Sequence, residues 1–183
     1  MAVRRPAVLH IATHGFFFPA RSVGDPAVRL DGLGSRLSVA DSPMLRSGLI
    51  LAGADYPERL TARGLMDGWA TALDLSQLDL RGTELVVLSA CNTGRGDYRT
   101  GEGVFGLQRA FRFAGAQSLI MSLFQVPDAA TQSLMTEFYR RWKPGMKAGS
   151  RQKALRQAQL KLLHNPATRE PKNWAGFVLM GDR

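Results

Sequence analysis

The sequence is poor in cysteine, in long apolar runs and in acidic residues, and each shortage excludes a class of protein. Cys91 is the only cysteine among 183 residues, which excludes an internal disulfide framework and fits a reducing compartment. The apolar runs fall short of the roughly 20 residues that cross a bilayer. Histidines interrupt the apolar run after residue 6, which argues against a signal peptide. We therefore expect a cytoplasmic protein without a membrane partner.

Acidic residues are outnumbered, since 24 Lys and Arg against 15 Asp and Glu give a net charge of +9. Such a charge is compatible with a nucleic acid, with an acidic partner, or simply with solubility. The arginines are scattered and form no tight cluster interleaved with aromatic residues. This pattern argues against nucleic acid as the main partner and favours solvated basic faces.

Apolar runs that resemble strands alternate with segments of helical period. Strands are expected at residues 7–13, 47–53, 84–90, 118–126 and 174–180, and helices at 70–77, 104–114, 127–142 and 150–163. This alternation predicts an α/β fold of three layers, in which a mostly parallel sheet carries helices on both faces. The length suits one domain, residues 1–183.

Two caps and two loops complete this outline. We expect Gly115 to end the helix at 104–114 and Ser150 to cap the last helix. Residues 21–45 and 92–103, which are rich in glycine and polar residues, are expected to be loops.

The first expected strand, residues 7–13, is apolar on both faces, which is typical of the middle of a sheet. A central strand needs a partner on each side, and the chain before residue 7 is too short to supply one. We therefore expect that the chain is the C-terminal part of a larger unit, or that a partner covers this edge.

Cys91 follows one apolar strand and His14 follows another, which favours a nucleophilic site. Free cysteine has a pKa of about 8.5, so a nearby histidine is needed to take its proton. Two neighbouring parallel strands would bring both residues to one edge of the sheet. Gly15 would let a substrate carbonyl approach its backbone N–H closely, as an oxyanion hole requires.

Structural roles compete with this interpretation. A lone cysteine after an apolar strand is more often buried and inert, and a histidine at a strand end is more often hydrogen-bonded than catalytic. We interpret His10 as structural and His164 as a C-terminal helix residue favoured by the dipole. A metal site from His10, His14 and Cys91 lacks the usual ligand spacing, so we expect no metal.

Two further patterns allow more than one interpretation. Residues 101–106 match the G-x-G-x-x-G pattern of nucleotide-binding loops, but they do not follow directly on a strand. We therefore prefer no nucleotide cofactor and keep a nucleotide-binding domain as a lesser alternative. Asp128 either matches the dipole in the first turn of a helix or lines a pocket beside Cys91 that selects a basic substrate side chain.

Two blocks of the sequence resemble a known family. Residues 10–17 (HIATHGFF) and 85–94 (LVVLSACNTG) resemble the histidine and cysteine blocks of CHAT domains. These are caspase-like peptidase domains, often found beside tetratricopeptide repeats and related to separase. Further matching blocks follow in the family order at residues 101–104, 109–111, 114–116, 122–128, 138–139 and 174–182. The resemblance covers nearly the whole chain.

The resemblance implies a caspase-like fold without its first strands and a Cys–His dyad that hydrolyses peptide bonds. Cys91 would be the nucleophile and His14 the general base and acid, with the amides of Gly15 and Cys91 forming the oxyanion hole. Asp128 occupies the place of an acidic residue that, in separase-like relatives, helps form the first specificity pocket. A preference for a basic residue before the cut is therefore implied.

The implied partners are a protein or peptide substrate and either a tetratricopeptide-repeat chain or an upstream half-domain. Asn92 stands where the family usually has glutamate, and Phe124 where tryptophan is common. A non-catalytic caspase-like module that binds other proteins is the competing hypothesis.

Overall fold

The computed structural model describes residues 5–18, 43–55, 68–92, 102–147 and 149–181. The chain forms two compact units. The first unit comprises Met1–Ala12, Asp79–Cys91 and Gly115–Arg183, and the second comprises Thr13–Leu78 and Asn92–Ala114. Along the chain the elements are β1 (Val8–Phe17), α1 (Pro43–Arg46), β2 (Ser47–Ile50), β3 (Trp69–Thr71), α3 (Ala72–Ser76), β4 (Leu85–Asn92), α4 (Glu102–Phe113), β5 (Ser118–Ser122), α5 (Asp128–Arg141), α6 (Ser150–His164), the 3-10 helix η2 (Pro171–Asn173) and β6 (Phe177–Met180).

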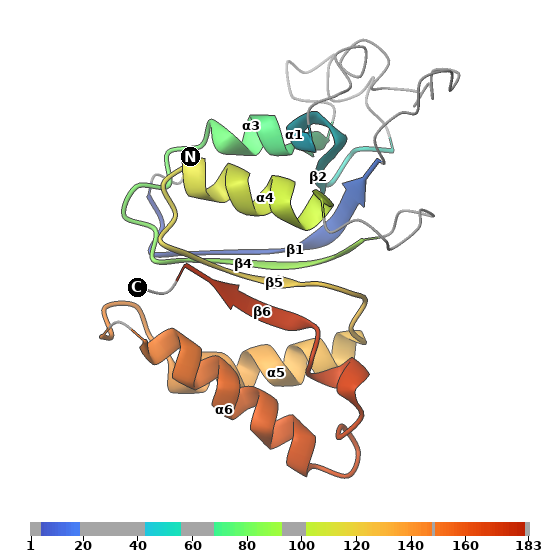
Figure 1. Ribbon diagram of the computed structural model, residues 1–183, viewed down its shortest axis with the longest axis vertical. Helices are drawn as coiled ribbons and strands as arrows, with labels where there is room; N and C mark the ends of the chain where they lie inside the picture. Colours follow the sequence, from blue (N-terminus) through green and yellow to red (C-terminus); the bar gives the residue numbers. More distant parts are fainter. Residues whose placement is uncertain (1–4, 19–42, 56–67, 93–101, 148, 182–183) are drawn as a thin grey trace. The chain divides into compact units, whose positions relative to one another are not determined.

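The six described strands follow the order β3-β2-β1-β4-β5-β6 and carry helices, which confirms the predicted α/β class (Figure 1). The sheet is mixed. Strands β4 and β5 are parallel, whereas β1–β2, β2–β3 and β5–β6 are antiparallel pairs. Hydrophobic pattern reveals which faces of a strand are buried but not the direction in which the strand runs, so these antiparallel pairs could not be read from it.

Strand β4 is the central element of the first unit. Its residues Leu85, Val86, Val87 and Leu88 are at most 1% exposed, and because successive side chains point to opposite faces, both faces of the strand are covered. Leu85 and Val87 belong to one cluster with Leu134 and Phe138 of α5 and with residues of α6. Burying each such side chain contributes about 1.5–3 kcal/mol.

Helix α5 forms where the sequence predicts it, to within one residue at either end. Ala130, Leu134 and Phe138 recur every four residues and are buried, so one stripe of the helix faces the core. Asp128 lies in the first turn and two arginines in the last, which matches the helix dipole at both ends.

Helix α6 begins differently from the expectation. Its N-cap is Gly149, in the left-handed conformation with φ 76°, and not Ser150. The Ser150 hydroxyl is buried and has no hydrogen-bond partner. The prediction was wrong because a glycine in this conformation brings the chain into the helix one residue earlier. Gly115, which was predicted to end α4, directly follows Ala114 and has φ 101°, as a left-handed cap residue would.

In the second unit, the later part of β1 pairs with β2, and β2 pairs with β3. The expected strand ends at Thr13, but β1 continues to Phe17. Phe16 is 5% exposed, and its ring packs edge-on against Trp69 with centroids 5.1 Å apart. Buried aromatic packing and pairing with β2 therefore extend the strand past His14.

Strand β2 comes from downstream in the chain and pairs with His14–Phe17 of β1. This pairing lies beyond the expected strand at residues 7–13, so the need for a further partner along that strand stays a prediction. Gly48 of β2 must be glycine, because a Cβ there would collide with the Ala70 carbonyl oxygen and the Phe16 ring. The strands thus approach one another closely at this position.

Helices α1, α3 and α4 belong to the second unit, where α3 lies beside α4 (Figure 1). A capping box starts α3, in which the Thr71 hydroxyl accepts from the Asp74 N–H and the Asp74 carboxylate accepts from the Thr71 N–H. Part of the predicted loop 21–45 is helical, because α1 begins at Pro43. Residues 21–42 of that loop, and residues 93–101 of the loop predicted at 92–103, lie outside the described residues.

Candidate active site

His14 and Gly15 lie inside strand β1 of the second unit. His14 stands opposite Ile50 of β2 and is exposed, whereas Gly15 stands opposite Leu49 and is buried. The Thr13 hydroxyl donates to the Ile50 carbonyl, which ties the backbone beside His14 to β2. Strand pairing therefore fixes the backbone of the histidine, while its side chain remains open to solvent.

Cys91 is the next-to-last residue of β4 and belongs to the first unit. The strand was expected to end at Ala90, but it continues through Asn92. The parallel register with β5 pairs Leu85 with Ser118 and Leu88 with Met121. The backbone that leads to Cys91 therefore continues a strand whose residues Leu85–Leu88 are buried.

Asp128 is the first residue of α5 in the first unit, and it is exposed. No side chain caps this helix, whose N-cap is Pro127. The carboxylate is therefore placed where the helix dipole favours it and where a cationic ligand can reach it. Both interpretations of Asp128 are compatible with this position.

The first unit also contains a polar cluster that the sequence did not reveal. His10 of β1 lies between Ser89 of β4 and Tyr139 of α5, with Nε2 3.4 Å from the Ser89 hydroxyl and Nδ1 3.1 Å from the Tyr139 hydroxyl. Partial burial lowers the pKa of His10 and raises that of Tyr139 to about 12. His10 was interpreted as structural, and these two partners lie 79 and 129 residues away in the chain, where no local pattern points to them.

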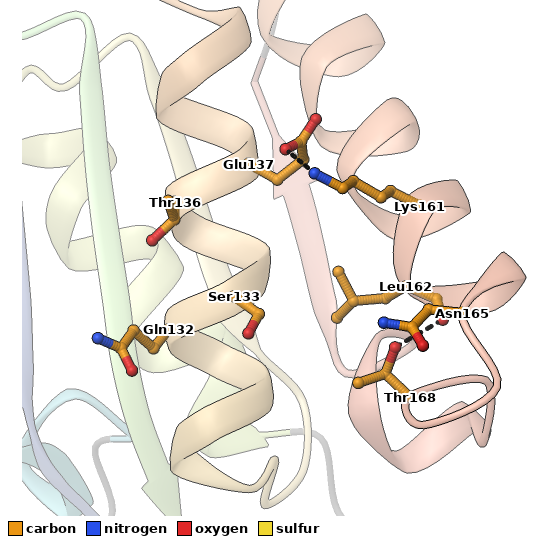
Figure 2. Close-up of a pocket in the computed structure, with 8 residues that line it drawn as sticks. All are labelled: Gln132, Ser133, Thr136, Glu137, Lys161, Leu162, Asn165 and Thr168. Carbon is orange, nitrogen blue, oxygen red and sulfur yellow. Dashed lines mark hydrogen bonds and ion pairs between the residues drawn. The ribbon is translucent and has the colours of Figure 1, made fainter.

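A cavity of about 350 Å³ lies between α5 and α6 (Figure 2). Its lining includes Glu137 and Lys161, whose Nζ lies 2.7 Å from the carboxylate. Two arginines, Arg140 and Arg141, also bind Glu137. The hydroxyls of Ser133 and Thr168 donate to backbone carbonyls. Glu137 and Lys161 pair with each other, the two hydroxyls bond backbone carbonyls, and none of the predicted site residues lines the cavity, so we interpret it as a gap between two helices.

The nucleotide-binding alternative finds a structural explanation for one of its glycines. Gly101 lies outside the described residues, and Gly103 is within α4. A Cβ on Gly106 would collide with the Ser47 hydroxyl of β2. Close packing of α4 on β2 therefore accounts for this glycine, without a phosphate.

Neither a metal centre nor a membrane span is found within the described ranges. No three His, Cys, Asp or Glu side chains there gather as metal ligands, and no described helix has the length and apolar character needed to cross a bilayer.

Comparison with known proteins identifies the family. The CHAT domain model matches residues 1–182. The chain is 30% identical over 187 residues to tetratricopeptide repeat protein 28 of Mus musculus and 30% identical over 186 residues to tetratricopeptide repeat protein 28 of Homo sapiens. Each alignment covers 98% of this chain but only 7% of the relative, so the chain spans a small fraction of these proteins. The chain belongs to the caspase-like CHAT domain family.

Proposed function

We propose that this chain is a cysteine endopeptidase that cleaves protein substrates with Cys91 and His14. The observation that carries the proposal is membership of a caspase-like family, together with the presence of both a histidine and a cysteine in the blocks that resemble the dyad. The exposure of His14 supports it, because a general base must reach its substrate. We treat residues 1–183 as one such domain.

In the proposed reaction His14 accepts the Cys91 proton, and the thiolate attacks the scissile carbonyl carbon to form a tetrahedral intermediate. The amides of Gly15 and Cys91 donate to the oxyanion. Collapse breaks the C–N bond, and His14 returns the proton to the leaving amine. Water then attacks the acyl-enzyme as His14 takes its proton, which releases the acid and the free thiol. Protons and bonds balance without a cofactor or metal.

We assign the substrate preference to Asp128. An exposed carboxylate at the start of α5 would attract an arginine or lysine before the scissile bond. Comparing cleavage after arginine with cleavage after leucine tests this assignment in Asp128→Asn, with Glu170→Gln as an exposed acidic control. An unchanged ratio in Asp128→Asn would remove the residue from the pocket.

A tetratricopeptide-repeat segment or an upstream half-domain is the proposed regulatory partner. The supporting observation is that the two relatives are named as tetratricopeptide repeat proteins and are far longer than this chain. We also place the protein in the cytoplasm, where its single thiol would stay reduced.

A peptide that carries arginine before an electrophilic group tests the dyad. We expect labelling of the native chain at Cys91, none in Cys91→Ala, and a rate at least about a hundredfold lower in His14→Ala. Labelling should be measured with and without a candidate repeat partner. If Cys91 reacts no faster with this peptide than with a simple alkylating agent in either case, the chain is not a peptidase.

A non-catalytic interaction module is the second candidate, and one observation favours it. Phe105 and Phe113 of α4 are 63% and 70% exposed, with the exposed Arg109 and Arg112 on the same helix. Exposed aromatic residues beside arginines are typical of binding surfaces, and this surface would suit a partner with apolar and acidic side chains. Binding that survives Cys91→Ala and is lost in Phe105→Ala would support this role.

A further inference from the structure

Three side chains of the first unit form a hydrogen-bonded chain that joins three elements. Tyr139 of α5 contacts Nδ1 of His10 at 3.1 Å, and Nε2 of His10 contacts Ser89 of β4 at 3.4 Å. The rings of His10 and Tyr139 also contact each other, with centroids 5.8 Å apart. Through His10, the central strand β4 is therefore connected to helix α5.

The hydrogen-bond donors and acceptors of the three side chains match one another. A neutral imidazole donates through one nitrogen and accepts through the other, whereas a hydroxyl can do either. Partial burial lowers the pKa of His10 and raises that of Tyr139, so both side chains are uncharged near neutral pH. One donor and one acceptor on the ring thus match the two hydroxyls.

The two ends of the hydrogen-bonded chain lie on the elements that carry two residues of the proposed site. Ser89 precedes Cys91 by two residues in the same strand, so a displacement of Ser89 moves the backbone at Cys91. Tyr139 lies on α5, whose first residue is Asp128, and it packs against the core cluster of the first unit. The chain therefore couples the strand of the proposed nucleophile to the helix of the proposed specificity residue.

We propose that His10 is a positioning residue. With Ser89 and Tyr139, it holds the end of β4 that carries Cys91 in a fixed position relative to α5. The inference rests on the proposed peptidase function, whereas the hydrogen-bonded contacts among the three side chains do not depend on catalysis. His10 does not touch the substrate in this proposal; it acts through Ser89 on the strand and through Tyr139 on the helix.

Three variants of the 183-residue protein each interrupt the hydrogen-bonded chain of Tyr139, His10 and Ser89. His10→Phe keeps an aromatic ring against Tyr139 but removes both nitrogens, while Ser89→Ala and Tyr139→Phe each remove one hydroxyl. His10→Gln restores one donor and one acceptor. His164→Phe at the end of α6 and Ser133→Ala, whose hydroxyl donates to Ala129 within α5, are matched controls. Circular dichroism and urea unfolding report folding; if His10→Phe fails to fold, the two milder variants decide.

The first measurement is alkylation of the protein by iodoacetamide across pH, which reports on Cys91 alone because the chain has one cysteine. We expect each interrupting variant to shift the rate by about three- to tenfold, toward the rate of the urea-unfolded chain. His10→Gln should return it part of the way, and the controls should match the native chain. Unchanged alkylation in all the folded interrupting variants would overturn the inference.

The second measurement is the ratio of labelling by arginine and leucine peptides that carry the same electrophile. A purely structural loss of stability lowers both rates together, whereas misalignment of β4 and α5 should lower the arginine preference as well. If the native protein shows no peptide-selective labelling while alkylation still responds to the variants, the peptidase proposal fails and the positioning inference stands. If the native protein shows peptide-selective labelling and the variants change neither measurement, the positioning inference fails and the peptidase proposal stands.

Discussion

Arg151 Nη1 donates a hydrogen bond of 2.8 Å to the backbone carbonyl of Glu84, the residue immediately before β4. The Ser118 hydroxyl donates to the same carbonyl at 2.6 Å. The guanidinium lies 5.8 Å from the centroid of the Trp142 ring, and the side chain of Arg151 is only 7% exposed. The start of the central strand is therefore anchored to helix α6 by a buried cation.

Arg151→Ala should lower the free energy of unfolding by about 1.5–3 kcal/mol, because it removes a charged donor and the packing on Trp142. Arg156→Ala on the same helix is the matched control, since Arg156 is exposed; it should change stability by less than about 0.5 kcal/mol. Urea denaturation of both variants measures the difference. Equal effects would show that the anchor contributes nothing.

Glu137 should make stability depend on pH in the acid range. Its side chain is only 4% exposed, and hydrogen bonds from Arg140, then from Lys161 and Arg141, lower its pKa to about 2 from the usual 4.5. Since the folded pKa is the lower one, the stabilisation is fully present above about pH 5 and is lost as the pH falls toward 2.

Glu137→Gln should therefore destabilise the protein at pH 7 by about 1.5–3 kcal/mol, and the gap to the native chain should close as the pH approaches 2. Glu170→Gln, in an exposed pair with Lys172, should have little effect at either pH. Thermal unfolding from pH 7 to pH 2 tests both variants. A gap that is constant across this range would contradict the assignment.

The sequence revealed the buried elements of this fold well. Strand β4 was predicted because its four buried residues are all apolar, and α5 because Ala130, Leu134 and Phe138 repeat at helical spacing. The end of β1 was missed because pairing with β2 and the contact of Phe16 with Trp69 are tertiary effects. Strand β3, only three residues long, carries too little pattern to be recognised.

The candidate site, like the fold, was predicted from the sequence only in part. His14, Gly15, Cys91 and Asp128 were predicted from their places at the ends of expected strands and at the start of an expected helix, and then from the family blocks; their catalytic and binding roles remain predictions. The hydrogen bonds of His10 to Tyr139 and Ser89 could not be predicted from the sequence, because each hydroxyl partner comes from another element. A histidine within an apolar strand reads as structural until its neighbours are known.

Gly48→Ala should destabilise the second unit by about 2–3 kcal/mol, because the new methyl group would overlap the Ala70 carbonyl oxygen and the Phe16 ring. Gly145→Ala is an informative comparison: nothing lies within 4 Å of a Cβ there, and only its φ of 81° disfavours a side chain. It should cost about 1 kcal/mol. Urea denaturation separates the two costs, and a Gly48→Ala variant no worse than Gly145→Ala would refute the close approach.

Ser150→Ala distinguishes the N-cap predicted from the sequence from the observed one. If Ser150 capped α6, its removal would cost about 1 kcal/mol. The structure instead assigns the cap to Gly149 and leaves the Ser150 hydroxyl buried without a partner. Removing an unsatisfied hydroxyl is neutral or favourable, so we expect the free energy of unfolding to stay the same or to rise by up to about 1 kcal/mol. Thr71→Ala, which removes the cap of α3, should lower it by about 1 kcal/mol in the same denaturation experiment. A loss in Ser150→Ala as large as that in Thr71→Ala would restore the serine cap.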